Sequence, residues 1–160
     1  MKKQGFTLIE LMVVIVIMGI LAAVAVPKLF GMIAKSKASE VPTAAGTYIN
    51  MQDAYAVEAS AIGSWAEIGY TGPGSNSSSG AKSAIFLYKE VAKGTNTAGW
   101  EAQPQQKLND CNTTNKWTLN AQYITSGNQQ GNVGYKANGD AVCKDLTPAW
   151  DKLDDGRSST

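Results

Sequence analysis

The sequence contains no histidine and only two cysteines among its 160 residues. Histidine is the commonest general base and the commonest metal ligand, so its absence excludes the usual catalytic and metal-binding arrangements. Charged residues make up 17% of the chain and the net charge is +1, which argues against a strongly basic nucleic-acid-binding surface. The sequence also lacks a phosphate-binding glycine loop and a clear nucleophile–base–orienter set. We therefore expect no enzyme activity, no metal site and no cofactor.

The apolar residues are concentrated in one long run near the N-terminus. Residues 6–26 read FTLIELMVVIVIMGILAAVAV and carry a single charge, Glu10. As a helix this run is about 31 Å long, which matches the hydrocarbon core of a bilayer. Two lysines precede it, and because basic flanks stay in the cytoplasm, the chain after Pro27 is expected on the other side. A secretory signal peptide is the alternative, but the run is longer than a typical h-region.

Glu10 is a carboxylate within this apolar run, where charged side chains are unfavourable and are usually paired and functional. It lies four residues, about one helical turn, after Phe6. Cleavage of the chain after Gly5 would give Phe6 a positively charged α-amino group close to this carboxylate. That amine could pair with its own Glu10 or with the Glu10 of a neighbouring subunit. The alternative is a carboxylate that reaches the lipid headgroups without a partner.

These N-terminal residues resemble the class III leader and first helix of type IV pilins. The similarity covers KKQG and FTLIELMVVIVIMGILAAVAVP, and the short leader is similar to those of the type IVa branch. The resemblance implies that a prepilin peptidase removes residues 1–5 by cutting between Gly5 and Phe6, and that it N-methylates Phe6. It also implies that residues 6–27 anchor the precursor in the bacterial inner membrane and later form the filament core. There Glu10 would pair with the Phe6 amine of a neighbour.

The resemblance further implies an α+β fold. A long N-terminal helix would pack its second half on an antiparallel β-sheet, within a soluble head of residues 28–160. Gly19 and Pro27 weaken the helix, because proline removes a backbone hydrogen bond. In the family the corresponding stretch, here about residues 19–28, can lose its helical form in the filament, and a kink at Pro27 is expected in the free subunit.

The second half of the helix is expected over residues 28–61. Its apolar residues recur at intervals of three and four, whereas Gln52 and most charged residues fall elsewhere. Pro42 and Gly46 interrupt this pattern, so a second bend is expected near residue 42. The predicted apolar stripe consists of Val41, Ala44, Ala45, Tyr48, Met51, Tyr55, Ala59 and Ile62.

The remaining chain is divided by turn signals and strand patterns. Residues 62–83 are rich in glycine and serine and are expected to form a variable, unmodified loop, with serine glycosylation as the alternative. The sheet is expected within residues 84–145, and the tail within 146–160, with the last seven residues disordered. Residues 84–91 fit a strand or one or two helical turns, and we favour the strand. Further strands are expected at 117–124, 132–137 and 141–145, with a tight turn at 138–140.

Cys111 and Cys143 are expected to form a disulfide, because a head outside the cytoplasm folds in an oxidising compartment. The bond would close a loop of about 33 residues and contribute roughly 3.5–4 kcal/mol by the chain-entropy estimate. In type IV pilins a disulfide here closes the C-terminal D-region, which often carries surface recognition.

Two further residue groups have alternative interpretations. The tryptophans suit either a compact core or a sugar-binding face, and we favour the core. Asp151, Asp154 and Asp155 are interpreted as a solvated acidic tail rather than a calcium site. The four tryptophans are Trp65, Trp100, Trp117 and Trp150.

The resemblance implies a structural subunit that leaves the inner membrane for an extracellular pilus used in adhesion, twitching motility and DNA uptake. Its partners would be other copies of the chain, the prepilin peptidase, the inner-membrane assembly machinery, the lipid bilayer and a host or environmental surface. One alternative is a pseudopilin of a type II secretion system, a group that commonly lacks the D-region disulfide. Another is a monomeric, membrane-anchored, glycan-binding module.

Overall fold

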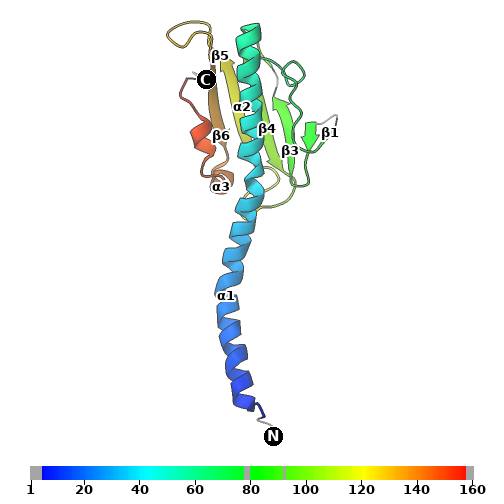
Figure 1. Cartoon of the computed structure of the whole chain (residues 1–160), viewed down its shortest axis with the longest axis vertical. Helices are drawn as coiled ribbons and strands as arrows, with labels where there is room; N and C mark the ends of the chain where they lie inside the picture. The colour runs from blue at the N-terminus through cyan, green and yellow to red at the C-terminus, as the bar shows by residue number, and fades with distance from the viewer. Residues whose placement is uncertain (1–4, 78–79, 92, 158–160) are drawn as a thin grey trace.

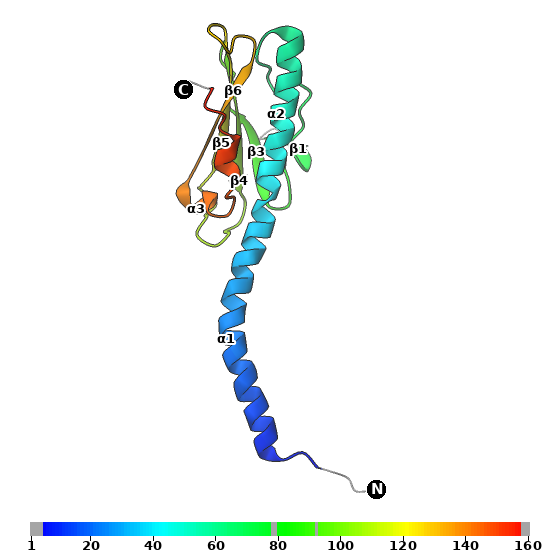
Figure 2. The same ribbon diagram turned by 60° about the vertical axis from the view of Figure 1, so that its left-hand side comes forward.

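The computed structural model describes residues 5–77, 80–91 and 93–157. It shows a helical shaft that projects from one end of a head (Figure 1). Helix α1 (Leu8–Ala38) forms the shaft, and helix α2 (Glu40–Ala59) continues it across one face of the sheet. The first turn of α1, drawn in dark blue, lies at the far end of the shaft from the head (Figure 2). The expected α+β architecture, with the second half of a long helix on an antiparallel sheet, is confirmed.

The long helix is interrupted at Ser39, three residues before the bend that the sequence predicts. Pro42 has no backbone N–H, so the carbonyl of Ala38 loses its usual helical partner. Ser39 keeps near-helical torsion angles, φ −62° and ψ −16°, and α1 and α2 therefore lie end to end. Two hydroxyls bond to the carbonyls around the break. Ser39 Oγ donates to the carbonyl of Ser36 at 2.7 Å, and Thr43 Oγ1 donates to that of Ser39 at 3.1 Å.

One face of α2 is buried against the sheet, as the apolar periodicity predicts. Toward its C-terminus the buried positions are Gln52 and Ala56, in place of the predicted Met51 and Tyr55. The helix ends at Ala59, two residues before the predicted end. The predicted stripe residues that are buried are Val41, Ala44, Ala45, Tyr48 and Ile62.

The sequence pattern places Gln52 on the polar face of the helix. This prediction is wrong, because the side chain of Gln52 is fully buried. Its Oε1 accepts the backbone N–H of Gly63 at 3.1 Å, and its Nε2 donates to the carbonyl of Gly63 at 2.6 Å. The same Nε2 also donates to the hydroxyl of Tyr48 at 3.0 Å. Burial of the amide is possible because its polar atoms have partners. The side chain thereby fixes the corner where the chain leaves α2.

Six antiparallel strands form one sheet whose spatial order follows the chain order from β1 to β6. The strand favoured within residues 84–91 is confirmed as β3, whereas the segment expected to be a loop contains β1 and β2. Strand β4 lies in a part of the chain where the sequence predicts no strand. The strands are β1 (Ser75–Ser77), β2 (Gly80–Lys82), β3 (Phe86–Val91), β4 (Thr97–Pro104), β5 (Trp117–Tyr123) and β6 (Val133–Gly139).

Side chains in rows across the strands form the core between the sheet and α2. Trp100 lies opposite Leu119, which lies opposite Ala137, and all three are buried. Trp117 and Trp150 are fully buried, and Trp65 is 9% exposed. The core interpretation of the tryptophans is therefore confirmed, and none of them offers an open stacking face for a sugar.

The C-terminal segment differs most from the sequence-based expectation. Asn138 and Gly139 belong to β6 instead of a tight turn. The strand expected at 141–145 is wrong: Ala141–Lys144 form the short helix α3. The carbonyl of Asp140 accepts the backbone N–H groups of Cys143 and Lys144 at 2.9 and 3.0 Å, so these donors are used locally and not in a ladder.

Residues 146–157, expected as a tail, belong to the head. The 3₁₀ helix η1 (Trp150–Leu153) packs against β6, and Trp150 Nε1 donates to the carbonyl of Asn138 at 2.8 Å. Asp155 then pairs with β6: its Oδ1 accepts the backbone N–H of Tyr135 at 3.0 Å. The predicted disorder of the last seven residues is therefore wrong for 154–157, and its remaining part, 158–160, lies outside the described residues.

Candidate functional site

The N-terminal helix begins at Leu8 with a capping box formed by Thr7 and Glu10. Glu10 Oε2 accepts the backbone N–H of Thr7 at 2.8 Å and its hydroxyl at 2.7 Å. The backbone N–H of Glu10 in turn approaches Thr7 Oγ1 at 3.4 Å. This arrangement satisfies donors that a helix start leaves free. Thr7 is a capping residue that the sequence-based predictions omit, although a threonine three residues before a glutamate and an apolar run is a recognised capping signature.

Gly5 and Phe6 precede the capped helix and are not helical. The side chain of Phe6 is 85% exposed. Phe6 and Glu10 line one shallow apolar depression together with Ile9, Val13 and Val14. The expected cleavage position and the lone acidic residue therefore lie on the same side of the shaft, and the peptide bond between Gly5 and Phe6 lies outside the helix.

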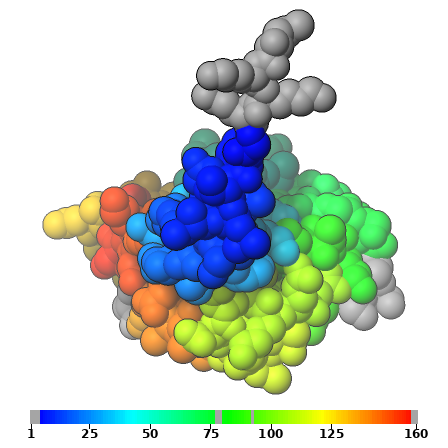
Figure 3. Space-filling view, turned by 90° about the horizontal axis from the view of Figure 1, so that it is seen from below, coloured from blue at the N-terminus to red at the C-terminus, as the bar shows by residue number. Residues whose placement is uncertain are grey.

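The shaft carries a continuous exposed apolar surface. From Leu8 to Ile33 its large apolar side chains are between 41% and 76% exposed, and the buried residues of α1 are Ala34 and Ala38. Figure 3 views this surface from the N-terminal end, where the shaft stands in front of the head. By length and composition this helix can cross a membrane. Apolar exposure on this scale is typical of a surface that is covered by lipid or by other helices.

Two positions expected to weaken the shaft lie inside α1 without ending it. The helix continues through Pro27, and Gly19 also lies within it. An added side-chain carbon at Gly19 would meet no neighbouring atom within 4 Å. Close packing in the isolated subunit therefore does not account for this glycine.

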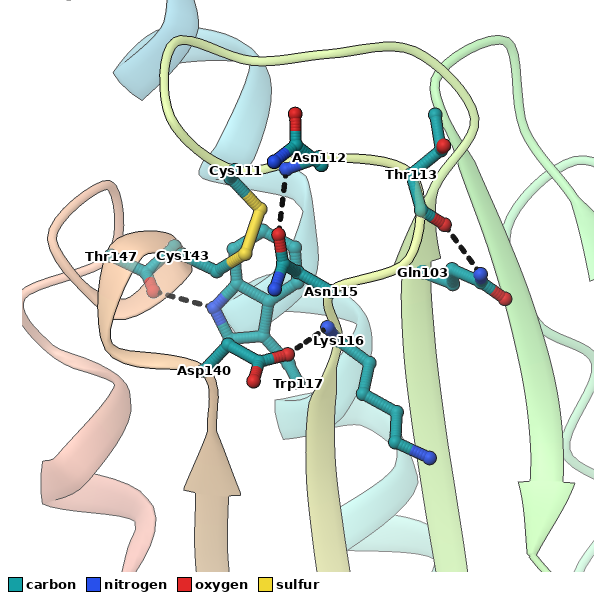
Figure 4. Close-up of a disulfide and its surroundings, with 10 residues drawn as sticks. All are labelled: Gln103, Cys111, Asn112, Thr113, Asn115, Lys116, Trp117, Asp140, Cys143 and Thr147. Carbon is teal, nitrogen blue, oxygen red and sulfur yellow. Dashed lines mark hydrogen bonds between the residues drawn. A yellow bond between two sulfur atoms is a disulfide. The ribbon is translucent and has the colours of Figure 1, made fainter.

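The disulfide between Cys111 and Cys143 is present and joins the segment after β4 to α3, with the two Cα atoms 4.8 Å apart. Both cysteines are fully buried, and Figure 4 shows the indole of Trp117 beside the bond. Trp117 Nε1 donates to Thr147 Oγ1 at 2.9 Å. The backbone N–H of Lys116 donates to Asp140 Oδ2 at 2.8 Å and ties the same two segments together (Figure 4).

Tyrosine hydroxyls hold the long helix on the sheet. Tyr88 donates to Glu40 Oε1 at 2.7 Å, and Tyr135 lies 2.8 Å from Asp53 Oδ1. Burial, followed by the hydrogen bond to the carboxylate, raises the pKa of both hydroxyls well above their usual value of 10.0. Both tyrosines therefore stay neutral donors, and the direction in which the shaft leaves the head is fixed by polar contacts as well as by apolar packing.

The C-terminal aspartates are engaged with neighbouring groups instead of forming a free acidic tail. Asp151 Oδ1 pairs with Lys144 Nζ at 2.6 Å, and Asp155 bonds to β6 and to Arg157. Within residues 5–77, 80–91 and 93–157, no group of three histidine, cysteine, aspartate or glutamate residues is arranged to hold a metal ion.

Comparison with known proteins bears directly on the N-terminal helix. A family model described as the prokaryotic N-terminal methylation motif matches residues 1–26. The matched residues include the expected cleavage position, Gly5 and Phe6, and the carboxylate of Glu10. Together with the α+β head and the disulfide, this confirms the resemblance to type IV pilins.

Curated relatives extend this pilin-like assignment beyond the motif. The type IV major fimbrial protein FimA of Dichelobacter nodosus is 28% identical over 156 residues, which cover 96% of this chain and 85% of that protein. The type IV major pilin protein PilA of Myxococcus xanthus is 42% identical over 69 residues, 39% of this chain and 31% of that one. A fimbrial protein of Moraxella nonliquefaciens is 56% identical over 43 residues, 27% of this chain and 28% of its own length. The match thus spans less than a third of the last two relatives, and no solved structure matches the chain significantly.

Proposed function

We propose that the chain is the structural subunit of a type IV pilus. It is made as a precursor in the bacterial inner membrane and polymerises through α1 into an extracellular filament. The observation that carries this proposal is the exposed apolar shaft with one acidic residue, Glu10, attached to a folded head. Such a surface is stable in lipid and is equally well covered by identical helices in a filament core.

Processing would precede assembly. A prepilin peptidase would cut between Gly5 and Phe6 and methylate the new amine of Phe6, and the inner-membrane assembly machinery would then extract the subunit. The non-helical state of residues 5–7 supports this step, because a peptide bond outside a helix is accessible to an enzyme without unfolding.

Glu10 would then set the register between subunits by pairing with the Phe6 amine of a neighbour. A subunit that docked out of register would leave a charge unpaired in a low-dielectric core, which is strongly unfavourable. Before assembly the carboxylate is held by Thr7 of its own chain. In the filament, Glu10 would therefore give up this contact with Thr7 or share it with the neighbouring amine. Separately, Gly19 and Pro27 would let the packed helix lose its helical form locally.

Adhesion, twitching motility and DNA uptake are the proposed uses of the filament, with the disulfide-closed region as a surface for a host or environmental ligand. The disulfide favours a pilus over a secretion-system pseudopilin. The burial of all four tryptophans speaks against the glycan-binding module, which would need them at the surface.

The proposal is tested by Glu10→Gln in cells that express the chain with its assembly system. Glutamine keeps an acceptor for the backbone N–H of Thr7, so the helix cap is retained while the charge is lost. We expect a processed, membrane-bound subunit and no surface filaments. Glu58→Gln, which removes an exposed acid of α2, is the matched control and should assemble normally.

The readouts are electron microscopy of sheared filaments and N-terminal sequencing of their subunit. Wild-type filaments should consist of a chain that starts at methylated Phe6. Filaments of Glu10→Gln at the wild-type level would refute the pairing, and a surface protein that keeps residues 1–5 and stays monomeric would refute the function.

A further inference from the structure

The exposed apolar surface of the shaft is longer than the hydrocarbon core of a bilayer. The helical part from Leu8 to Val26 already comes close to spanning the core, at about 28 Å. Beyond it, Leu29, Phe30, Met32 and Ile33 are 56%, 62%, 63% and 41% exposed. The helix from Leu8 to Ile33 is about 39 Å long, close to the full thickness of a bilayer with its headgroups. In a membrane-anchored subunit these four side chains would therefore lie at the level of the headgroups on the side of the head.

Three lysines flank this apolar group along the chain. Lys28, Lys35 and Lys37 form no ion pair within the part of the chain that the structure describes. No acidic residue lies between residues 28 and 37, and the next one along the chain, Glu40, accepts the hydroxyl of Tyr88. We call residues 28–37 the collar.

The lysines are distributed around the helix. Lys28 and Lys35 are seven residues apart and lie on nearly the same side, whereas Lys37 lies about 200° from Lys35. Lys28 borders a shallow apolar depression that it forms with Ala25, Val26, Leu29 and Met32. Such a side chain can lay its aliphatic stem on apolar surface and direct its ammonium group into the headgroup layer.

We propose that the collar docks on the anionic headgroup layer of the outer leaflet of the inner membrane while the subunit awaits assembly. This inference rests on the membrane-anchored precursor of the proposed function. The ligand is a lipid surface that carries phosphodiester charges, contacted by apolar side chains at headgroup depth and by the three ammonium groups around them. A mixture of large apolar and basic side chains at this depth is what interfacial helices use to bind anionic lipid.

The expected strength follows from the charges. Each lysine close to an anionic leaflet should raise the ratio of docked to undocked subunits about fivefold. Three lysines together should raise this ratio on the order of a hundredfold. This attraction weakens as added salt shortens the Debye length to a few ångströms. The collar would therefore hold the head close to the membrane at low salt and release it at high salt.

The test uses the full chain in nanodiscs of phosphatidylcholine with or without phosphatidylglycerol. Single nitroxide labels are attached at Ile15→Cys in the span, Ile33→Cys in the collar and Asn50→Cys on α2, since both native cysteines are bonded to each other. The measured quantity is the collision rate of each label with a water-soluble nickel chelate. We expect the label at residue 33 to be shielded severalfold relative to residue 50 when phosphatidylglycerol is present.

Two triple variants identify the cause of the shielding. Lys28→Gln with Lys35→Gln and Lys37→Gln should expose the label at residue 33. The matched change of three exposed lysines on the head, Lys82, Lys107 and Lys152, removes the same charge and should leave it shielded.

The outcomes separate the two proposals. A label at residue 33 as accessible as residue 50 in anionic discs, with residue 15 shielded, overturns the collar and leaves the anchor standing. Shielding that survives the collar variant also overturns the inference, because apolar contact alone would then explain it. Exposure of residue 15 would overturn the membrane anchor itself.

Discussion

Replacing Gln52 by methionine should destabilise the head strongly, although the two side chains are similar in length. The change removes the partners of the backbone N–H and the carbonyl of Gly63, which is buried. An unsatisfied buried polar group costs about 1–3 kcal/mol. The hydroxyl of Tyr48 also loses the hydrogen bond that it accepts from Gln52. Methionine recovers part of this by apolar burial. We expect a loss of about 2–4 kcal/mol from a total of roughly 5–15 kcal/mol.

The assay is urea unfolding of the full chain in detergent micelles, followed by the fluorescence of the buried tryptophans. The free-energy difference is taken from the shift in midpoint at constant slope. Gln106→Met is the control, because Gln106 is exposed and the same chemical change there should lie within about 0.5 kcal/mol of wild type. A loss for Gln52→Met no larger than that of the control would refute the role of this amide.

Two further predictions concern the head. The double variant Cys111→Ala, Cys143→Ala should lose roughly 3.5–4 kcal/mol in the same unfolding assay, because it opens a loop of about 33 residues in the unfolded chain; a loss below about 1 kcal/mol would contradict this. Lys93, together with the N–H and hydroxyl of Ser64, lowers the pKa of Glu67 from 4.5 to about 2. Since the folded pKa is depressed, these contacts contribute fully above about pH 4.5 and are lost as the pH falls through about 2. An NMR titration of the Glu67 carboxyl should show this, and Lys93→Gln should move the pKa back toward 4.5.

The elements predicted correctly are those whose signal is local. The apolar run that became α1, the strand β5 with alternating Trp117, Leu119 and Ala121, and the single possible cysteine pair needed no knowledge of distant contacts. The resemblance to pilins likewise depends on consecutive residues at the N-terminus.

The elements that were missed depend on distant partners. Strand β4 contains Gly99, Glu101 and Pro104, which are poor strand formers, and its alternation of Ala98, Trp100 and Ala102 is weak on its own. The strand is stabilised by ladders to β3 and β5 on both sides. A ladder on both sides overrides a weak intrinsic preference.

The errors near the C-terminus and in α2 have the same origin. Val142 and Cys143 favour a strand by composition. However, β6 already extends to Gly139, which pairs with Trp117, the first residue of β5, so β5 offers no further residue for the ladder to continue. The chain then turns into α3 and brings Cys143 to Cys111. The sequence predicts a surface position for Gln52 because its hydrogen-bond partner, Gly63, lies eleven residues further along the chain and outside the helical pattern.

The order of the strands bears on how such a head could fold while the chain is still being delivered. Every strand pairs with its immediate neighbour in the chain, so a sheet delivered N-terminus first can grow by one hairpin at a time without waiting for a distant segment. Cys143 comes after the last strand in the chain, so its bond to Cys111 can form only once all six strands have been delivered. A free thiol at Cys111 would therefore mark a chain in which residue 143 has not yet reached the folded sheet.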